Sequence, residues 1–190
     1  MFNSFKKLCQ LFKNKGNNDD LFIKAKKLSP LVTKSAVEAT KTLFKELKKK
    51  WNMKIDDKSG KVVLETLLFY LHYIDRIAYH RFGARQRDIF MDALLAEIEQ
   101  WLLSFCENKT EATGLSLAFE ETYSKRQREY APYKLLAEKN GEISGTIFWE
   151  FGKKIAGILG DENNIAVILL VKLIIHSSLM ALPLPDFFKK

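Results

Sequence analysis

The stretch KVVLETLLFYLHYIDRIAYHRF, residues 61–82, decides the fold class. It is far longer than a typical β-strand of about 5–6 residues, and no turn residue interrupts it. Its polar side chains share one side when successive residues are placed about 100° apart, as in an α-helix. A helix that is apolar over the rest of its circumference must be covered by neighbours on most sides. The stretch therefore predicts a central helix in an all-α protein.

The other long segments show the same helical periodicity, and none alternates apolar and polar residues over the length of a strand. Polar turns such as IDDKSG (55–60) and KNGE (139–142) separate them. We expect an irregular multi-helix bundle of about six core helices, preceded by an N-terminal amphipathic helix. The predicted core helices cover residues 21–28, 30–52, 61–82, 84–106, 111–130, 143–159 and 162–182, of which the first is short.

Local signals divide the ends of the chain from its middle. NKGNNDD (14–20) is typical of a polar linker, and Ser29 followed by Pro30 is typical of an N-cap and the first position of a new helix. The tail LPLPDFFKK (182–190) holds two prolines and is predicted not to be helical. The predicted organisation is an amphipathic basic helix with a linker (1–20), a single helical domain (21–182) and a C-terminal tail (183–190).

Composition indicates a compact protein of a reducing compartment. The 190 residues suit one domain, 47% of them are hydrophobic, and only two are cysteines. The first fifteen residues lack the continuous apolar core of a signal peptide, so we expect a cytoplasmic protein that can also lie peripherally at a membrane. The apolar segment 165–184 contains Lys172, which costs about 3 kcal/mol in a membrane centre. We expect it to be a buried core helix.

The net charge of +8 lies in the first third of the chain. Residues 1–58 hold 15 lysines and 6 acidic residues, whereas residues 59–190 hold 16 basic and 17 acidic residues. On the predicted 30–52 helix, four lysines share one side, opposite the apolar side: Lys34, Lys41, Lys45 and Lys48. This pattern is typical either of a solvated helix face or of a surface that contacts an anionic partner.

The N-terminal amphipathic segment, residues 2–13, favours a membrane partner among the anionic ones. Its apolar side, the candidate for insertion, consists of Phe2, Phe5, Leu8 and Phe12. The alternative is that this side packs on the protein's own core or on a second subunit. A specific nucleic-acid partner is not expected, because the first 58 residues contain no arginine, the usual base reader.

The polar stripe on the 61–82 helix is the other candidate site. It consists of Glu65, His72, Asp75, Arg76 and His80. Spacings of three and four residues favour structural pairing, and the alternative is a polar pocket that binds a ligand or performs catalysis. Helical di-iron sites need Glu-x-x-His, which the chain lacks, so we expect no metal site. Motifs of nucleotide sites and hydrolases are also absent, so we assign no catalytic residue and no cofactor.

The 111–130 helix and the one after it carry weaker signals. Mixed charges indicate a solvated, salt-bridged surface at Glu120, Glu121, Lys125, Arg126, Arg128 and Glu129. Tyr123, Tyr130 and Tyr133 are expected in the core rather than along a groove. Glycines at 145, 152 and 157 are compatible with a close approach of neighbouring helices.

Together these patterns favour a non-enzymatic helical interaction protein whose basic N-terminal third contacts an anionic surface such as membrane lipid. One alternative is a ligand-binding or enzymatic bundle that uses the polar stripe. A second alternative is unspecific nucleic-acid binding through lysine. A protein partner or a homo-oligomer is compatible with each of them.

Overall fold

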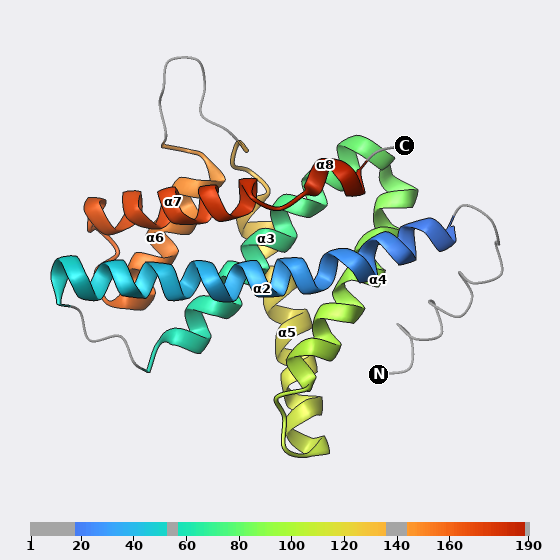
Figure 1. Cartoon of the computed structure of the whole chain (residues 1–190), viewed down its shortest axis with the longest axis horizontal. Helices are drawn as coiled ribbons and strands as arrows, with labels where there is room; N and C mark the ends of the chain where they lie inside the picture. Colours follow the sequence, from blue (N-terminus) through green and yellow to red (C-terminus); the bar gives the residue numbers. More distant parts are fainter. Residues whose placement is uncertain (1–17, 53–56, 136–143, 189–190) are drawn as a thin grey trace. The chain divides into compact units, whose positions relative to one another are not determined.

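The structure, a computed structural model, describes residues 18–52, 57–135 and 144–188. These residues form seven helices and no β-strand, which confirms the predicted all-α multi-helix class. The predicted N-terminal helix lies outside the described residues. The helices, drawn in Figure 1, are α2 (Asn18–Trp51), α3 (Ser59–Phe82), α4 (Ala84–Leu103), α5 (Lys109–Tyr130), α6 (Ile147–Leu159), α7 (Ile165–Met180) and α8 (Leu184–Phe187).

The chain divides into two compact units. Among the described residues, unit 1 contains residues 18–31, 75–117 and 184–188, and unit 2 contains residues 32–52, 57–74, 118–135 and 144–183. Three helices, α2, α3 and α5, therefore contribute residues to both units. The predicted single domain over residues 21–182 is a coarser division, and it stays a prediction.

The predicted helix boundary at Ser29 and Pro30 is wrong, because α2 continues through Pro30. The predicted linker also extended too far, since α2 already begins at Asn18. The buried positions of α2 explain the continuity. They recur every three or four residues on both sides of the proline, so one uninterrupted helix buries them all: Leu21, Ala25, Leu28, Val32, Ala36, Ala39, Leu43 and Leu47. Pro30 itself is exposed, so a carbonyl that it leaves without its helical partner can bond to water.

Unit 1 has an aromatic core to which the C-terminal tail contributes. The rings of Phe82, Phe90 and Phe188 contact one another with centroid distances of 5.4 to 5.7 Å. Leu184 is also buried. The prediction that the tail is not helical is wrong, because α8 forms one turn after Pro183. Pro185 stands in the first turn of α8, where a helix does not need the missing N–H.

Unit 2 has its own aromatic core, centred on Phe69 of α3. The Phe69 ring stacks on Phe151 of α6 at a centroid distance of 4.3 Å and meets Phe148 of α6 and Tyr130 of α5 edge to face. Four residues adjoining Phe69 along α3 are fully buried as well: Leu67, Leu68, Tyr70 and Leu71. The apolar stretch that decided the fold class thus forms the buried centre of this unit.

Helices α6 and α7 pack closely because α6 carries Gly152. A Cβ atom at this position would lie 2.9 Å from Ile168 Cγ2 and 3.0 Å from the Ile168 carbonyl oxygen, both on α7. The connection between the helices is short, with Gly160 in the left-handed conformation after α6 and Asn164 as the N-cap of α7. Gly152 provides the close approach that the glycines suggested, whereas Gly145 lies in a turn before α6 with φ 75°.

Helix α7 is only partly buried, which corrects the prediction of a buried core helix. One side packs into unit 2, with Val171, Ile175 and Leu179 almost inaccessible. The other side is apolar and exposed at Ile165, Leu169, Leu173 and Met180. Within the described part of the chain, every helix is too short or too polar to span a bilayer.

Candidate functional site

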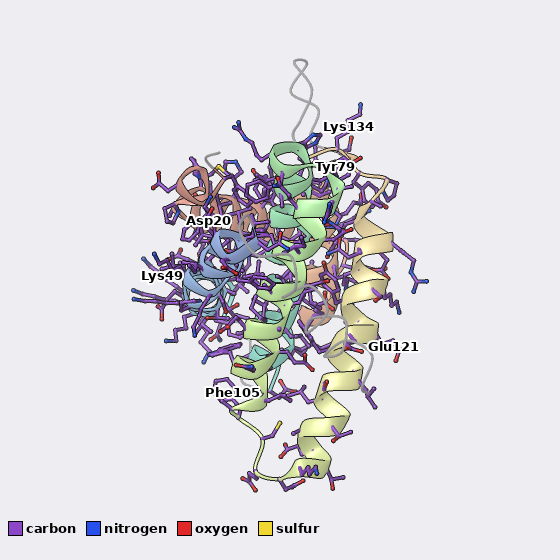
Figure 2. All side chains as sticks on the ribbon, turned by 90° about the vertical axis from the view of Figure 1, so that its right-hand side faces the viewer. Asp20, Lys49, Tyr79, Phe105, Glu121 and Lys134 are labelled. Carbon is purple, nitrogen blue, oxygen red and sulfur yellow. The ribbon has the colours of Figure 1, made fainter. Side chains whose placement is uncertain are left out.

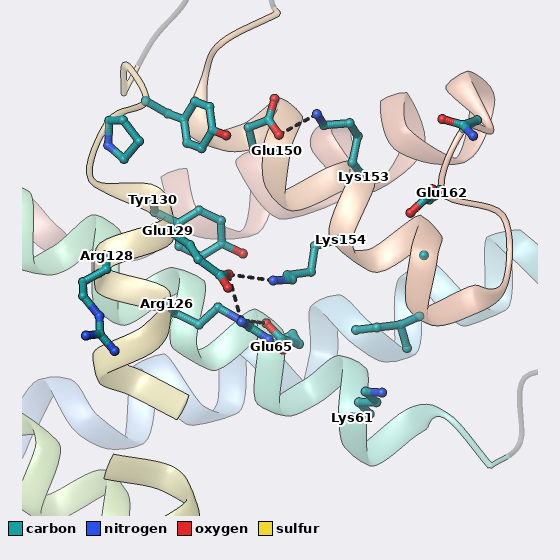
Figure 3. A pocket seen from close by; sticks show the side chains of 15 residues that line it. Lys61, Glu65, Arg126, Arg128, Glu129, Tyr130, Glu150, Lys153, Lys154 and Glu162 are labelled. Atoms are coloured by element: carbon teal, nitrogen blue, oxygen red, sulfur yellow. Dashed lines mark hydrogen bonds and ion pairs between the residues drawn. The ribbon is translucent and has the colours of Figure 1, made fainter. Parts of the chain in front are cut away.

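A groove of about 990 Å³ opens between α3, the C-terminal end of α5 and α6, all within unit 2. Figure 3 shows the side chains that line it. Most of them are charged, and they include five cations and four carboxylates. The cations are Lys61, Arg126, Arg128, Lys153 and Lys154, and the carboxylates are Glu65, Glu129, Glu150 and Glu162.

Helical spacing brings these groups to one place. On α3 the lining residues Lys61 and Glu65 are four apart, and on α5 Arg126 is followed by Glu129 and Tyr130 at three and four residues. Side chains at these spacings share one side of a helix. On α6 the same rule aligns Glu150 with Lys153 and Lys154. Each of the three helices therefore presents a polar side to the groove.

A chain of ion pairs crosses the groove. Arg126 holds Glu65 through two hydrogen bonds, one from Nε to Oε2 at 2.7 Å and one from Nη2 to Oε1. Its remaining terminal nitrogen donates to Glu129 at 2.8 Å, and Lys154 donates to the same Glu129 oxygen at 2.6 Å. Figure 3 shows these contacts as dashed lines. One glutamate carboxylate therefore bridges two cations that come from different helices.

Burial distinguishes the Arg126–Glu65 ion pair from a surface salt bridge. The side chains of Arg126 and Glu65 are only 11% and 6% exposed. Their hydrogen bonds raise the pKa of the Arg126 guanidinium, which therefore stays charged. The prediction of Arg126 as part of a solvated surface is thus wrong. Sequence alone offers no sign of this, since Glu65 is 61 positions away.

Glu129 is the more accessible carboxylate in this chain of ion pairs, because its side chain is 35% exposed. Burial raises the pKa of its carboxyl, but the hydrogen bond and charge of Lys154 and the charge of Arg126 outweigh burial. The pKa of Glu129 therefore lies below its ordinary value. Glu129 is an anion held by two cations at the wall of an open groove.

Tyr130 adds a buried polar atom that has no partner within the described part of the chain. The residue is 2% exposed, and its hydroxyl is buried and forms no hydrogen bond within the described residues. In Figure 3 the hydroxyl points toward the place where Glu129 and Lys154 meet. Burial and the negative charge of Glu65 raise the pKa of this phenol, so it remains a neutral donor. The prediction that Tyr130 packs in the core holds for its ring, and the residue also belongs to the lining of the groove.

The predicted polar stripe is divided among separate contacts. Glu65 lines the groove, and His72 Nδ1 lies 2.6 Å from Gln127 Oε1. Asp75 binds Arg87 of α4 through both carboxylate oxygens. Arg76 is half-buried and His80 is exposed. Of the five stripe residues, only Glu65 lines this groove, and a ligand at the other four stays a prediction.

Among the described residues, no three His, Cys, Asp or Glu side chains are grouped so that they could hold a metal ion. Three of the four groove carboxylates, Glu65, Glu129 and Glu150, are instead engaged by lysine or arginine, as in the Glu150–Lys153 pair at 2.6 Å. The arrangement is suited to hold an anion rather than a cation.

The predicted lysine face lies on the exposed side of α2 in unit 2. Lys34, Lys41, Lys45 and Lys48 are all exposed, and the opposite side of the helix is buried. Figure 2 shows the neighbouring Lys49 extending away from the ribbon. Glu38 is the acid nearest this face and pairs with Lys41 at 2.9 Å. The predicted insertion residues, Phe2, Phe5, Leu8 and Phe12, lie outside the described residues.

Comparison with known proteins adds no family to this picture. No protein-family model, no curated protein and no solved structure matches the chain.

Proposed function

We propose that the protein is a non-enzymatic interaction protein whose lysine face, formed by Lys34, Lys41, Lys45 and Lys48 of α2, contacts an anionic lipid surface. The observation that carries this proposal is the exposure of all four lysines on one side of a helix whose opposite side is buried. A firmly packed helix presents its charges in a fixed row, so they can approach a flat surface together. Each lysine near such a surface contributes about 1 kcal/mol.

The earlier part of α2 supports a lipid partner over a purely polar one. Ile23 and Leu31 are 51% and 37% exposed, and Lys27 lies between them. Spacings of four residues place these three side chains on one side of the part of α2 that belongs to unit 1. Exposed aliphatic groups between lysines are suited to an interface that has both headgroup charge and apolar depth. Nucleic acid would engage the lysines alone.

The test is co-sedimentation with vesicles. The chain is expected to bind vesicles of phosphatidylserine and phosphatidylcholine, and to bind pure phosphatidylcholine much less. Replacing the four lysines with glutamine removes about 4 kcal/mol of attraction at low ionic strength, which weakens binding by roughly two to three orders of magnitude. Binding of the unchanged chain should fall as salt rises, and the variant should show a flatter salt dependence.

A matched control separates the lysine face from net charge. Replacing four exposed cations elsewhere, Arg81, Arg85, Lys109 and Lys125, with glutamine removes the same charge. This control is expected to keep most of the vesicle binding. An equal loss in both variants would show that only net charge acts. Tighter binding of the unchanged chain to duplex DNA than to vesicles would favour the nucleic-acid alternative.

A second copy of the chain is the second candidate partner, and α7 is the observation that favours it. Its exposed stripe, Ile165, Leu169, Leu173 and Met180, spans about 22 Å at 1.5 Å per residue. Exposed apolar patches commonly mark interaction surfaces, and a single helix stripe can pair with itself across a two-fold axis. Sedimentation analysis of the unchanged chain and of Leu173→Glu tests this, with a monomer in both cases contradicting it.

A further inference from the structure

We propose that the groove of unit 2 is a binding site for the phosphate group of a phosphate monoester, held by Arg126, Lys154 and the Tyr130 hydroxyl. This site is independent of the lysine face on α2. Three donors from α5 and α6 surround one position in it, and none of the comparisons assigns a role to them.

The strongest evidence for a ligand is the Tyr130 hydroxyl, for which the described residues offer no hydrogen-bond partner. Buried hydroxyl groups nearly always have a hydrogen-bond partner, because desolvation without one is costly. The Tyr130 ring is held by the core, since it meets Phe69 edge to face at a centroid distance of 5.7 Å. The hydroxyl therefore cannot turn to bulk solvent without disturbing the core, and it points toward Glu129 and Lys154 (Figure 3). An acceptor in the groove would satisfy it.

The charge arrangement indicates that this acceptor is an anion. Glu129 bridges Arg126 and Lys154 at 2.8 and 2.6 Å, so one carboxylate already occupies an anion position. Its side chain is 35% exposed and can rotate toward solvent, which would release two cationic donors. Glu129 would then act as an internal substitute for the ligand. Buried Glu65 keeps its own two bonds to Arg126 and holds the guanidinium in place.

The number of donors favours phosphate over carboxylate. Arg126, Lys154 and Tyr130 supply three separate donors, and a phosphate monoester presents three terminal oxygens. A carboxylate has two oxygens and a single negative charge, so it offers these donors fewer acceptor atoms and less charge than a phosphate monoester does. Lys61, exposed at the same groove, adds positive charge for a dianion. Tyr133 and Ile158 also line the groove and offer apolar area to the rest of the ester.

The direct test is calorimetric titration with glycerol 3-phosphate, with sodium chloride at matched ionic strength in the reference. Binding is expected for the unchanged chain. Tyr130→Phe removes a single oxygen atom and is expected to weaken binding about tenfold, since a hydrogen bond to a charged group is lost. Lys154→Met by itself should weaken binding more than Tyr130→Phe does. Glu129→Gln should tighten binding, because the internal anion that competes with the ligand is gone.

Thermal unfolding separates a ligand site from a packing defect. Tyr130→Phe is expected to unfold at an equal or higher temperature than the unchanged chain without ligand, and to lose the rise in midpoint that glycerol 3-phosphate produces. Tyr73→Phe changes another buried tyrosine that does not line the groove. This control should keep the full ligand-dependent rise. The variant with glutamine at the four lysines of α2 should keep it too.

The phosphate monoester can be a soluble molecule or a lipid headgroup, and two arms distinguish these sources. Loss of glycerol 3-phosphate binding in Tyr130→Phe supports a soluble ligand. If Tyr130→Phe instead loses binding only to vesicles that contain phosphatidic acid, the ligand is a lipid headgroup. If neither probe binds the unchanged chain, or if Tyr130→Phe and Lys154→Met both bind as it does, the proposal is overturned.

Discussion

Two arginines, Arg87 in unit 1 and Arg126 in unit 2, make the same kind of contact in different surroundings. Each holds a carboxylate of α3 through two hydrogen bonds, Asp75 for Arg87 and Glu65 for Arg126. Each also binds a carboxylate of its own helix, Asp88 at 2.7 Å and Glu129 at 2.8 Å.

The two groups differ in burial and in the contacts of the second carboxylate. The Arg87 side chain is 31% exposed and Asp88 is 60% exposed, so this group ends in solvent. The Arg126 side chain is 11% exposed, and Glu129 continues to Lys154 along the groove wall. One pairing chemistry can therefore tie helices together, or it can do so and also line a groove. Whether the group is extended into a groove decides between these two roles.

The largest expected effect comes from removing the arginines. Arg126→Met leaves the Glu65 carboxylate, 6% exposed, without its cation, which costs about 3–5 kcal/mol of unfolding free energy. Arg87→Met should cost less, about 1–2 kcal/mol, because water reaches this pair. Urea unfolding of both variants measures the difference. Equal losses in the two variants would contradict the expected difference between the buried and the exposed pair. Adding Glu65→Leu to Arg126→Met should recover much of the unfolding free energy.

The second-largest effect on stability is expected from the packing of α6 against α7. Gly152→Ala places a methyl group 2.9 Å from an Ile168 side-chain carbon and should cost about 1–3 kcal/mol. Since α6 carries Lys154, this change should also weaken binding in the groove. Gly157→Ala on the same helix is the control, because its nearest neighbour would be Glu162 Cβ at 3.5 Å. It should leave stability unchanged or raise it by up to about 1 kcal/mol. Thermal unfolding of both variants measures this.

A smaller effect of opposite sign is expected at Tyr130. Without ligand, Tyr130→Phe removes a buried hydroxyl that has no hydrogen bond within the described residues, so the unfolding free energy should rise by about 1 kcal/mol. Tyr70→Phe should lower it by a similar amount, because the Tyr70 hydroxyl bonds to the Ser178 hydroxyl. A fall in both variants would show that the Tyr130 hydroxyl is already satisfied.

The smallest effect is the pH dependence of Glu129. Its folded pKa lies below the ordinary glutamate value of about 4.3, so its contribution is present above that pH and is lost as pH falls through the folded pKa. Glu129→Gln should therefore flatten the loss of stability below about pH 4.3. The counterpart Asp88→Asn should change stability by less than about 0.5 kcal/mol at neutral pH. Urea midpoints at several pH values measure both.

Much of the secondary structure was predictable, and the pairing of side chains was not. Periodicity placed α3 to within two residues, because the apolar positions that repeat along it are the positions that pack. The predictions of a helix boundary at Pro30 and of a non-helical tail at Pro185 were wrong. Local helix signals contribute less free energy than the burial of the residues around them. Glu65 stood out as a polar residue in an apolar helix, but its partner Arg126 looked like one charge among many.

The sequence by itself determined the all-α class, the lengths of most helices, the charged side of the 30–52 segment and the polar stripe of the 61–82 segment. These properties depend on the order of residues within a few turns of one helix. The tertiary structure decided that Arg126, Tyr130 and Lys154 lie together beside Glu129 and that one side of α7 stays uncovered. The reason is physical: such contacts join residues that are far apart along the chain, and only the packing of the helices around Phe69 and Gly152 brings them within a few ångströms of one another.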